Sequence, residues 1–169
     1  MSCRIQIVDY DPQWPKSFAR EADRIRDALG NLALRIEHTG STSFPGLVAK
    51  PVVDMLLVVP NSSDEAAYSP ALHAAGYTLV IREPDWFEHR MFNRQDSAVN
   101  LHVFTSGCAE IERILLFRNW LRSDAADRDR YARTKRELAQ AEWPSVQCYA
   151  DAKSDVIGQI IARAQGLLA

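Results

Sequence analysis

The sequence lacks most of the features that would assign a location or a class of partner at once. Its 169 residues contain 20 Lys and Arg against 22 Asp and Glu, so neither sign of charge dominates. We therefore expect no broad electrostatic binding to nucleic acid or to an anionic membrane. No apolar run approaches the length of a membrane-spanning helix. The first residues lack the apolar core of a signal peptide, so we expect a cytoplasmic protein.

Cysteine is also scarce, and the three cysteines form no motif. Cys3, Cys108 and Cys148 are odd in number and far apart, and none belongs to a CxxC or Cys/His spacing. This excludes a disulfide framework and structural zinc, and predicts reduced thiols. The spacings GxxxxGK[ST] and GxGxxG are absent too, so neither a P-loop nor a Rossmann turn is expected.

The remaining pattern predicts an α+β protein. No repeat, low-complexity tract or linker divides the chain, which suits a single domain over residues 1–169. We predict strands over 32–37, 52–59, 77–82, 89–94 and 98–104, and helices over 14–29, 66–75, 111–121, 127–142 and 146–168. Strands in the middle and helices at the end indicate a mixed sheet with helices packed on one face and a C-terminal run of three helices. The oligomeric state is left open.

The most informative segment is EHTGSTSFPGLVAKPVVDMLLVV, residues 37–59. Its second half is typical of a short buried strand, except that Asp54 interrupts the apolar run. An ionised carboxylate in such a strand is costly unless its charge is compensated. Loop amides at a strand end could hold it; alternatively, Asp54 binds a metal.

The loop before this strand has the composition of an anion site. Gly40, Ser41 and Thr42 offer small side chains, hydroxyls and accessible backbone N–H groups, which can hold phosphate oxygens. Ordinary turns use the same residues, so the turn alone is weak support. Lys50 and Asp54 nearby make a phosphate site a reasonable hypothesis.

Polar residues on the central strands offer further candidates. Alternation places Asn100 and His102 on one face of their strand, and Glu88 and Arg90 on one face of the strand before it. The simpler interpretation is a solvated face. If the strands are neighbours, however, Asp54, Glu88 and His102 converge as a catalytic group. Two carboxylates and an imidazole suit a divalent cation or an acid–base pair.

Each of the last three predicted helices places one cation on its inward stripe. These are Arg118, Lys135 and Lys153. Any one of them alone would be interpreted as a side chain whose aliphatic part packs at the edge of the core while its charge reaches water. Three together favour a buried anion, either Asp54 or the phosphates of a ligand. The predicted phosphate- and nucleotide-binding set is Gly40, Ser41, Thr42, Lys50, Arg90, Arg118, Lys135 and Lys153.

These motifs resemble one known family over nearly the whole chain. The matching segments are EHTGSTSFPGLVAKPVVDMLLVV, DWFEHRMF, VNLHVF, IERILLFRNWLRSD, YARTKRELA and YADAKSDVI. They identify the chain as a member of the GrpB family, which is placed by similarity in the DNA polymerase beta-like nucleotidyltransferase superfamily. The resemblance implies a nucleotidyltransferase-like sheet.

The resemblance also implies roles for particular residues. In that superfamily a Gly-Ser turn holds the triphosphate of a nucleotide, and an Asp-x-Asp/Glu pair on the next strand binds Mg²⁺. Gly40, Ser41 and Asp54 match, whereas Leu56 stands where the second carboxylate is expected. A third ligand from a later strand would be Glu88 or His102.

The sequence thus predicts a protein that binds a nucleoside triphosphate, or another phosphorylated small molecule, with Mg²⁺. One hypothesis is an enzyme that transfers a nucleotidyl group to an acceptor that the sequence does not identify. The alternative is a non-catalytic nucleotide- or phosphometabolite-binding module that has lost full metal chemistry. Leu56 favours this alternative.

Overall fold

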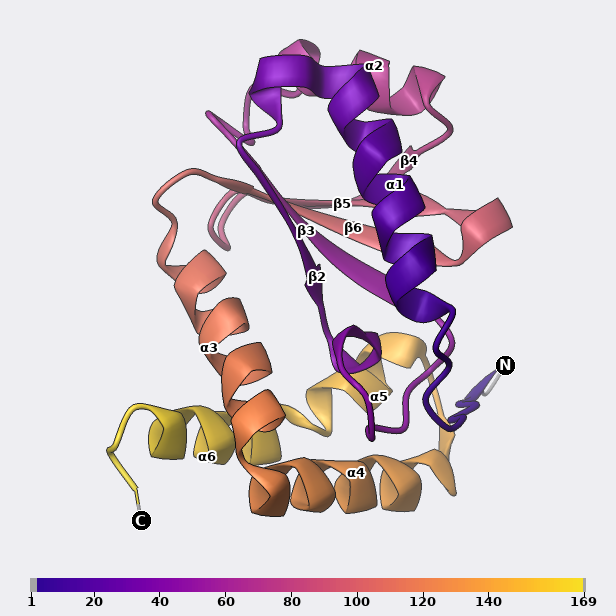
Figure 1. Cartoon of the computed structure of the whole chain (residues 1–169), viewed down its shortest axis with the longest axis vertical. Helices are drawn as coiled ribbons and strands as arrows, with labels where there is room; N and C mark the ends of the chain where they lie inside the picture. The colour runs from indigo at the N-terminus through magenta and orange to yellow at the C-terminus, as the bar shows by residue number, and fades with distance from the viewer. Residues whose placement is uncertain (1–2, 169) are drawn as a thin grey trace.

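A five-stranded mixed sheet forms the centre of the computed structural model, which describes residues 3–168 (Figure 1). The strands are β2 (Arg35–Thr39), β3 (Val53–Val59), β4 (Thr78–Glu83), β5 (His89–Arg94) and β6 (Val99–Thr105), in the order β2-β3-β6-β5-β4. β3 and β6 run parallel, and the other neighbours are antiparallel. The α+β fold with a mixed sheet is therefore confirmed.

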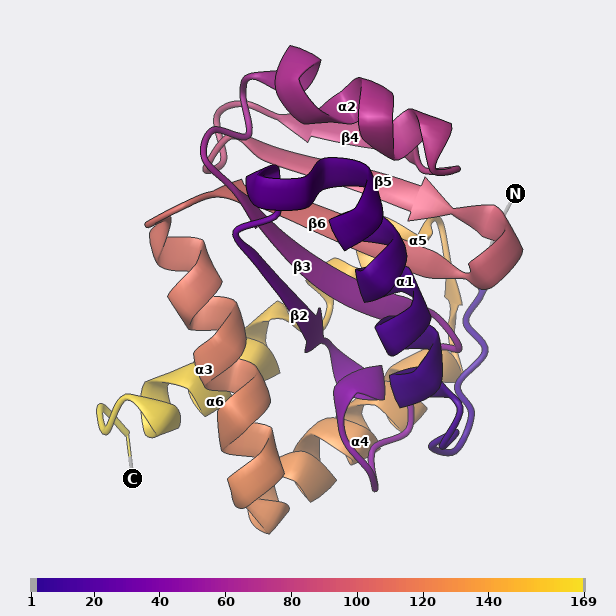
Figure 2. The same ribbon diagram turned by 45° about the horizontal axis from the view of Figure 1, so that its top comes forward.

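Two helices cover one face of this sheet, as Figure 2 shows. They are α1 (Trp14–Leu29) and α2 (Glu65–Ala74). Ala22, Ile25 and Leu29 follow one another at three- and four-residue spacing, and all are buried against the sheet. Alternation along β3 sends Val53, Met55, Leu57 and Val59 into this core. The even-numbered side chains of β3, Asp54 among them, are left for the other face.

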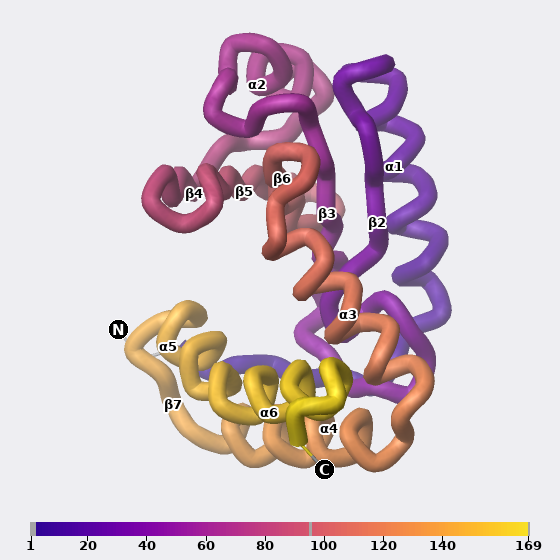
Figure 3. Tube along the Cα trace, turned by 90° about the vertical axis from the view of Figure 1, so that its left-hand side faces the viewer, coloured from indigo at the N-terminus to yellow at the C-terminus, as the bar shows by residue number. Residues whose placement is uncertain are grey.

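The C-terminal helices lie toward that second face. They are α3 (Ala109–Ser123), α4 (Ala125–Ala139), α5 (Val146–Asp151) and α6 (Ser154–Ala164). Ile111 and Leu115 of α3 cover Leu56, Val58 and Phe104 of the sheet. Figure 3 shows α4, α5 and α6 gathered in one layer that α3 joins to the sheet. Within residues 3–168, no helix is long and apolar enough to cross a membrane.

Several elements differ from the sequence prediction. The helix predicted over 146–168 is two helices, because Ala152 and Lys153 separate α5 from α6. Cys3–Arg4 (β1) and Glu142–Trp143 (β7) pair as a small antiparallel sheet, which is too short to leave a periodic signal. Short 3₁₀ helices occupy Gly30–Leu32, Ser41–Ser43 and Gln95–Ser97.

Candidate functional site

The turn after β2 is packed directly against Asp54. Thr39, the last residue of β2, pairs with Asp54 of β3, and Gly40 follows at once. Gly40 has φ +66°, and a Cβ there would lie 2.7 Å from Oδ2 of Asp54. Glycine is therefore required at this position both by the left-handed backbone and by the carboxylate. The close approach brings the hydroxyl-bearing residue Ser41 beside Asp54.

Asp54 is less buried than its apolar strand suggests. Its side chain is 35% exposed, because it points to the sheet face that α1 and α2 do not cover. The parallel register sets it opposite Asn100, whose Nδ2 donates to Oδ1 of Asp54 at 3.3 Å. Nε2 of His102 lies 3.8 Å from the same oxygen. Asn100 and His102 share one face of β6, as alternation predicts, and Asp54 lies beside both.

The electrostatics keep Asp54 ionised. The surrounding protein withdraws water and raises its pKa, but His102, then Asn100 and Lys50, lower it further, so that the net shift is downward. Asp54 is therefore a carboxylate at neutral pH, available to a cation.

Two lysines reach this site from the C-terminal helices. Nζ of Lys135 donates to Oγ of Ser41 at 2.6 Å, and the residue is only 2% exposed. The amines lie over aromatic rings, 4.9 Å from the Tyr131 centroid for Lys135 and 4.6 Å from the Tyr149 centroid for Lys153. Among residues 3–168, neither amine has a carboxylate within salt-bridge distance. In the described residues, these two amines therefore lack an anionic partner at close range.

Burial lowers the pKa values of both amines. Burial, and next the charge of Lys153, lower the pKa of Lys135 to about 6, although Asp54 opposes this. Burial lowers the pKa of Lys153 to about 8, again against Asp54. A polyanion placed between them would remove much of this penalty, because it would compensate the charged form.

The sequence predicted no role for Tyr131 and Tyr149, whose rings lie under the two amines. The Tyr149 hydroxyl is buried and makes no hydrogen bond to any residue that the structure describes. Burial raises the pKa of Tyr149 to about 12, so this phenol stays protonated and can donate. A buried donor without an acceptor beside Lys153 is consistent with an anion at this place.

Glu88 lies elsewhere, and its predicted convergence on Asp54 is wrong; Arg90, predicted in the phosphate-binding set, lies with Glu88. Arg90 donates to Glu65 of α2 at 2.6 Å and to Glu88 at 3.2 Å. The reason is register: β5 runs antiparallel to β6, so Glu88 lies beyond the Thr105 end of β6. Asp54 lies at its Asn100 end. It is His89, one residue on, that faces the same side as His102, and the alternation along β5 was the signal available to find it.

Thr42 and Arg118, both predicted to bind phosphate, make hydrogen bonds to protein groups. Thr42 is 1% exposed and shares a hydrogen bond of 2.9 Å with Nε2 of His38. Nη1 of Arg118 donates to Glu37 at 2.7 Å and to the His38 carbonyl at 3.0 Å. Both join α3 and the Gly-Ser turn to β2. These bonds hold both side chains against β2.

The site brings few metal-ligand side chains together. In the part of the chain that the structure describes, no group of three or more His, Cys, Asp or Glu gathers as a metal site. Leu56, where a second carboxylate would stand, is fully buried under α3. Asp54 with His102 nevertheless fits a cation that arrives with a nucleotide, because Mg²⁺ commonly takes one or two protein carboxylates and completes its shell with phosphates and water.

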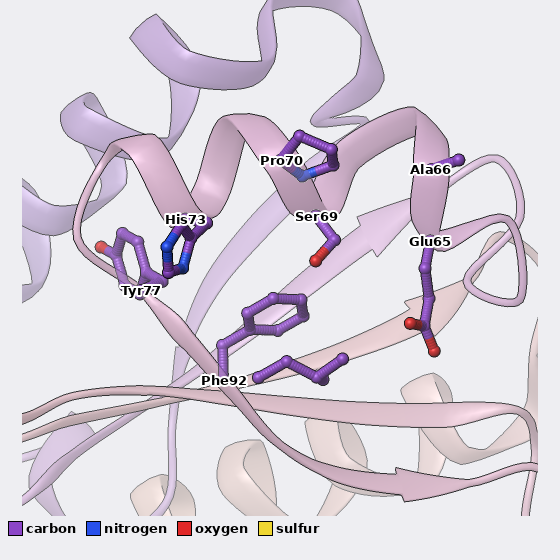
Figure 4. A pocket seen from close by; sticks show the side chains of 8 residues that line it. Glu65, Ala66, Ser69, Pro70, His73, Tyr77 and Phe92 are labelled. Atoms are coloured by element: carbon purple, nitrogen blue, oxygen red, sulfur yellow. The ribbon is translucent and has the colours of Figure 1, made fainter.

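A second pocket is separate from this site. It has a volume of about 390 Å³ and lies between α2 and the sheet, lined among others by Glu65, His73, Tyr77 and Phe92 (Figure 4). Phe92 belongs to the core on the α1 and α2 face. The pocket therefore opens on the opposite side of the sheet from Asp54.

The fold, with a Gly-Ser turn packed on a strand carboxylate, is that of the nucleotidyltransferases. The Cid1 poly(U) polymerase with MgGTP bound superimposes with a TM-score of 0.54 at 12% identity, over 78% of this chain and 44% of that one. At this identity the likeness shows the fold alone.

The chain belongs to the GrpB protein family, whose model matches residues 4–163. A UPF0157 protein of Halalkalibacterium halodurans is 61% identical over 95% of this chain and 82% of its own length. A UPF0157 protein of Streptomyces coelicolor is 45% identical over 95% and 84%. The conserved protein GrpB from Enterococcus faecalis superimposes with a TM-score of 0.84 at 30% identity, over 95% of this chain and 98% of that one.

Proposed function

We propose that this protein binds a nucleoside triphosphate together with a divalent cation and transfers its nucleotidyl group to an acceptor. Ser41, Lys135 and Lys153 hold the triphosphate, and Lys50 adds charge at the edge of the site. Asp54 holds the cation. The acceptor is left unassigned, because no contact in the site selects one.

One observation carries this proposal: the amines of Lys135 and Lys153 are held near enough to Asp54 to feel its charge, yet among residues 3–168 neither has a carboxylate within salt-bridge distance. Lys135 donates to Ser41 at 2.6 Å while 2% exposed. A buried amine without a carboxylate is costly. Proteins retain such an arrangement where a ligand supplies the missing negative charge, and a polyphosphate supplies several charges at once.

In the transfer, an acceptor oxygen forms a bond to the α-phosphorus and the α–β phosphoanhydride bond breaks. Pyrophosphate leaves with the bonding electrons, and the acceptor proton passes to solvent. A bound cation would neutralise charge on the phosphates. Lys135 and Lys153 stabilise the departing pyrophosphate, and Ser41 fixes its position.

A second candidate function is a binding module without turnover. Leu56 supports it, because an apolar side chain packed under α3 replaces the second carboxylate of the two-metal arrangement. Such a module would use Ser41, Lys135 and Lys153 in the same way, but would leave the phosphoanhydride intact.

Calorimetry with ATP, GTP, CTP and UTP, each with and without Mg²⁺, tests binding, and pyrophosphate release tests transfer. Lys153→Met should weaken binding by about tenfold or more, because a charge-assisted contact contributes about 1.5–3 kcal/mol. Lys16→Met removes an exposed lysine of α1 and serves as the control.

The outcomes separate the two functions. Mg²⁺-dependent binding with pyrophosphate release supports the transferase, and Asp54→Asn should then abolish turnover. Binding that does not need Mg²⁺, without pyrophosphate release, supports the module. No binding of any nucleotide under either condition contradicts both.

A further inference from the structure

The hydroxyl of Tyr149 is a hydrogen-bond donor that the protein leaves unused. Tyr149 is 1% exposed, and its hydroxyl makes no hydrogen bond to any residue that the structure describes. Among those same residues, Oγ of Ser97 is the one other buried side-chain polar atom in this condition. Buried polar groups almost always have a partner, because a group without one has lost its water and gained nothing in exchange. An acceptor supplied by a ligand would remove this cost.

Two neighbours hold the Tyr149 ring in place. Nζ of Lys153 lies 4.6 Å from the ring centroid, and the Trp143 ring meets the Tyr149 ring at 6.1 Å and 71°. Lys153 follows Tyr149 by four residues, which is the spacing that brings side chains together over a helical turn. A flip of the ring about its own axis leaves the hydroxyl where it is. The packing therefore fixes the position of the donor.

The hydroxyl lies near the Gly-Ser turn of the candidate site. Burial raises the pKa of Tyr131, the nearby Tyr149 phenol raises it further, and a hydrogen bond with Ser41 opposes both. Ser41 also accepts a hydrogen bond from Nζ of Lys135 at 2.6 Å. The two phenols are therefore close to each other, and one of them reaches the serine that the buried amine contacts.

These neighbours suit an oxyanion. Burial raises the pKa of Tyr149 to about 12, so the phenol keeps its hydrogen, and Lys153 adds positive charge beside it. A carbonyl or hydroxyl group of a ligand accepts the hydrogen bond but leaves the amine uncompensated, and a cation is repelled by the amine. A phosphate group does both, because one of its oxygens accepts from the phenol while another faces the amine.

We propose that Tyr149 is a binding residue that donates its hydroxyl hydrogen to a phosphate oxygen of the ligand, beside Lys153. The assignment rests on the phosphate site of the proposed function, but not on the nucleotide, the cation or the transfer. It divides the site in two: Asp54 takes the cation, whereas Tyr149 and the two lysines take the phosphates. A phosphate chain should therefore bind even when no divalent cation is present.

Access to the hydroxyl requires a movement, because the hydroxyl is buried in the free protein. Lys153 lies over the ring, is partly exposed and has a flexible four-carbon stem. Rotation of this stem carries the amine from the ring to the phosphate, which exchanges a cation–π contact for a charge-assisted hydrogen bond. The phosphate then meets Tyr149 and Lys153 together.

Tyr149→Phe removes the donor and keeps the ring. Calorimetry with inorganic triphosphate, without divalent cations, measures the affinity, and urea unfolding of the free protein measures stability. The variant should bind triphosphate about tenfold more weakly or worse, because it loses a hydrogen bond to a charged group. The urea midpoint of the free variant should equal or exceed that of the wild type, because no hydrogen bond within the protein is lost.

Tyr68→Phe is the matched control on the other face of the sheet. Tyr68 is also 1% exposed, but its hydroxyl donates to the Ser62 carbonyl at 2.6 Å. Its loss should lower the urea midpoint and leave triphosphate affinity within about twofold of the wild type. The two variants should therefore show opposite patterns, which a general structural loss does not produce.

Unchanged triphosphate affinity in Tyr149→Phe overturns the assignment. So does a fall in its urea midpoint as large as that of Tyr68→Phe, because the hydroxyl would then have a partner already. A wild type that binds no triphosphate overturns it as well.

ATP with Mg²⁺ separates this assignment from the proposed function. If the wild type and Tyr149→Phe bind ATP equally well, the assignment fails and the proposed function stands. If triphosphate binding depends on Tyr149 but ATP does not bind, the proposed function fails and the assignment stands.

Discussion

Filling the site with a polyphosphate should draw protons into the protein. Burial holds the pKa of Lys135 at about 6 and that of Lys153 at about 8 in the free protein. An anion that touches both amines stabilises their charged forms and raises both pKa values. By linkage, the ligand and the protons then bind together.

The size of the effect follows from these pKa values. At about pH 7.5, about 3% of Lys135 and about three quarters of Lys153 carry a proton before binding. Complete protonation on binding therefore takes up about one proton at Lys135 and about a quarter of a proton at Lys153. At about pH 6 Lys135 is already half protonated, so the uptake falls to about half a proton. Uptake thus rises with pH across this window.

Calorimetry of inorganic triphosphate binding in buffers of different ionisation enthalpy measures the uptake. Lys135→Met should reduce it at about pH 7.5 from about 1.2 protons to about a quarter. Lys16→Met should leave it unchanged. An uptake near zero in the wild type, or one that survives in Lys135→Met, would refute the assignment of the buried amine to the anion.

Three further predictions concern stability. Gly40→Ala should destabilise the fold by about 1–3 kcal/mol, because it combines left-handed strain with a Cβ 2.7 Å from a carboxylate oxygen. At Gly107, φ is +81° and an added Cβ would meet nothing within 4 Å, so Gly107→Ala should lower stability by the backbone strain alone. Urea unfolding compares the stability of the two variants. Leu56→Asp should not create a metal site; it should destabilise by about 2–5 kcal/mol in the same assay, because it buries a charge under α3. Arg118→Met should lower stability by about 1–3 kcal/mol through the loss of its bonds to Glu37, yet leave ATP affinity within about twofold.

Elements with strong local signals could be predicted from the sequence. Helix α1 has its predicted bounds, because Pro15 favours its first turn and Gly30 ends an amphipathic stripe. The break at Ala152 and Lys153 could not be found, since apolar residues continue at helical spacing with neither proline nor glycine there to end the helix.

The site could be predicted where its residues are close in sequence. It could not be predicted where the register between strands determines which residues are neighbours. Gly40, Ser41 and Asp54 lie on consecutive elements, so their contact follows from one tight connection. Alternation assigns residues to a face but does not say which face meets Asp54, so Glu88 was chosen where His89 lies. Helical periodicity likewise predicts that Arg118 faces inward, but it does not predict that Glu37 is its partner.

The separation of these groups along the chain has a consequence for biosynthesis. Ser41 and the Lys135 that binds it are 94 residues apart. Because a nascent chain leaves the ribosome from its N-terminus, the residues of the sheet emerge before either lysine. A ligand that needs both cannot assist the early steps of folding. Such a ligand would bind only after α4 and the segment that carries Lys153 have been made and docked.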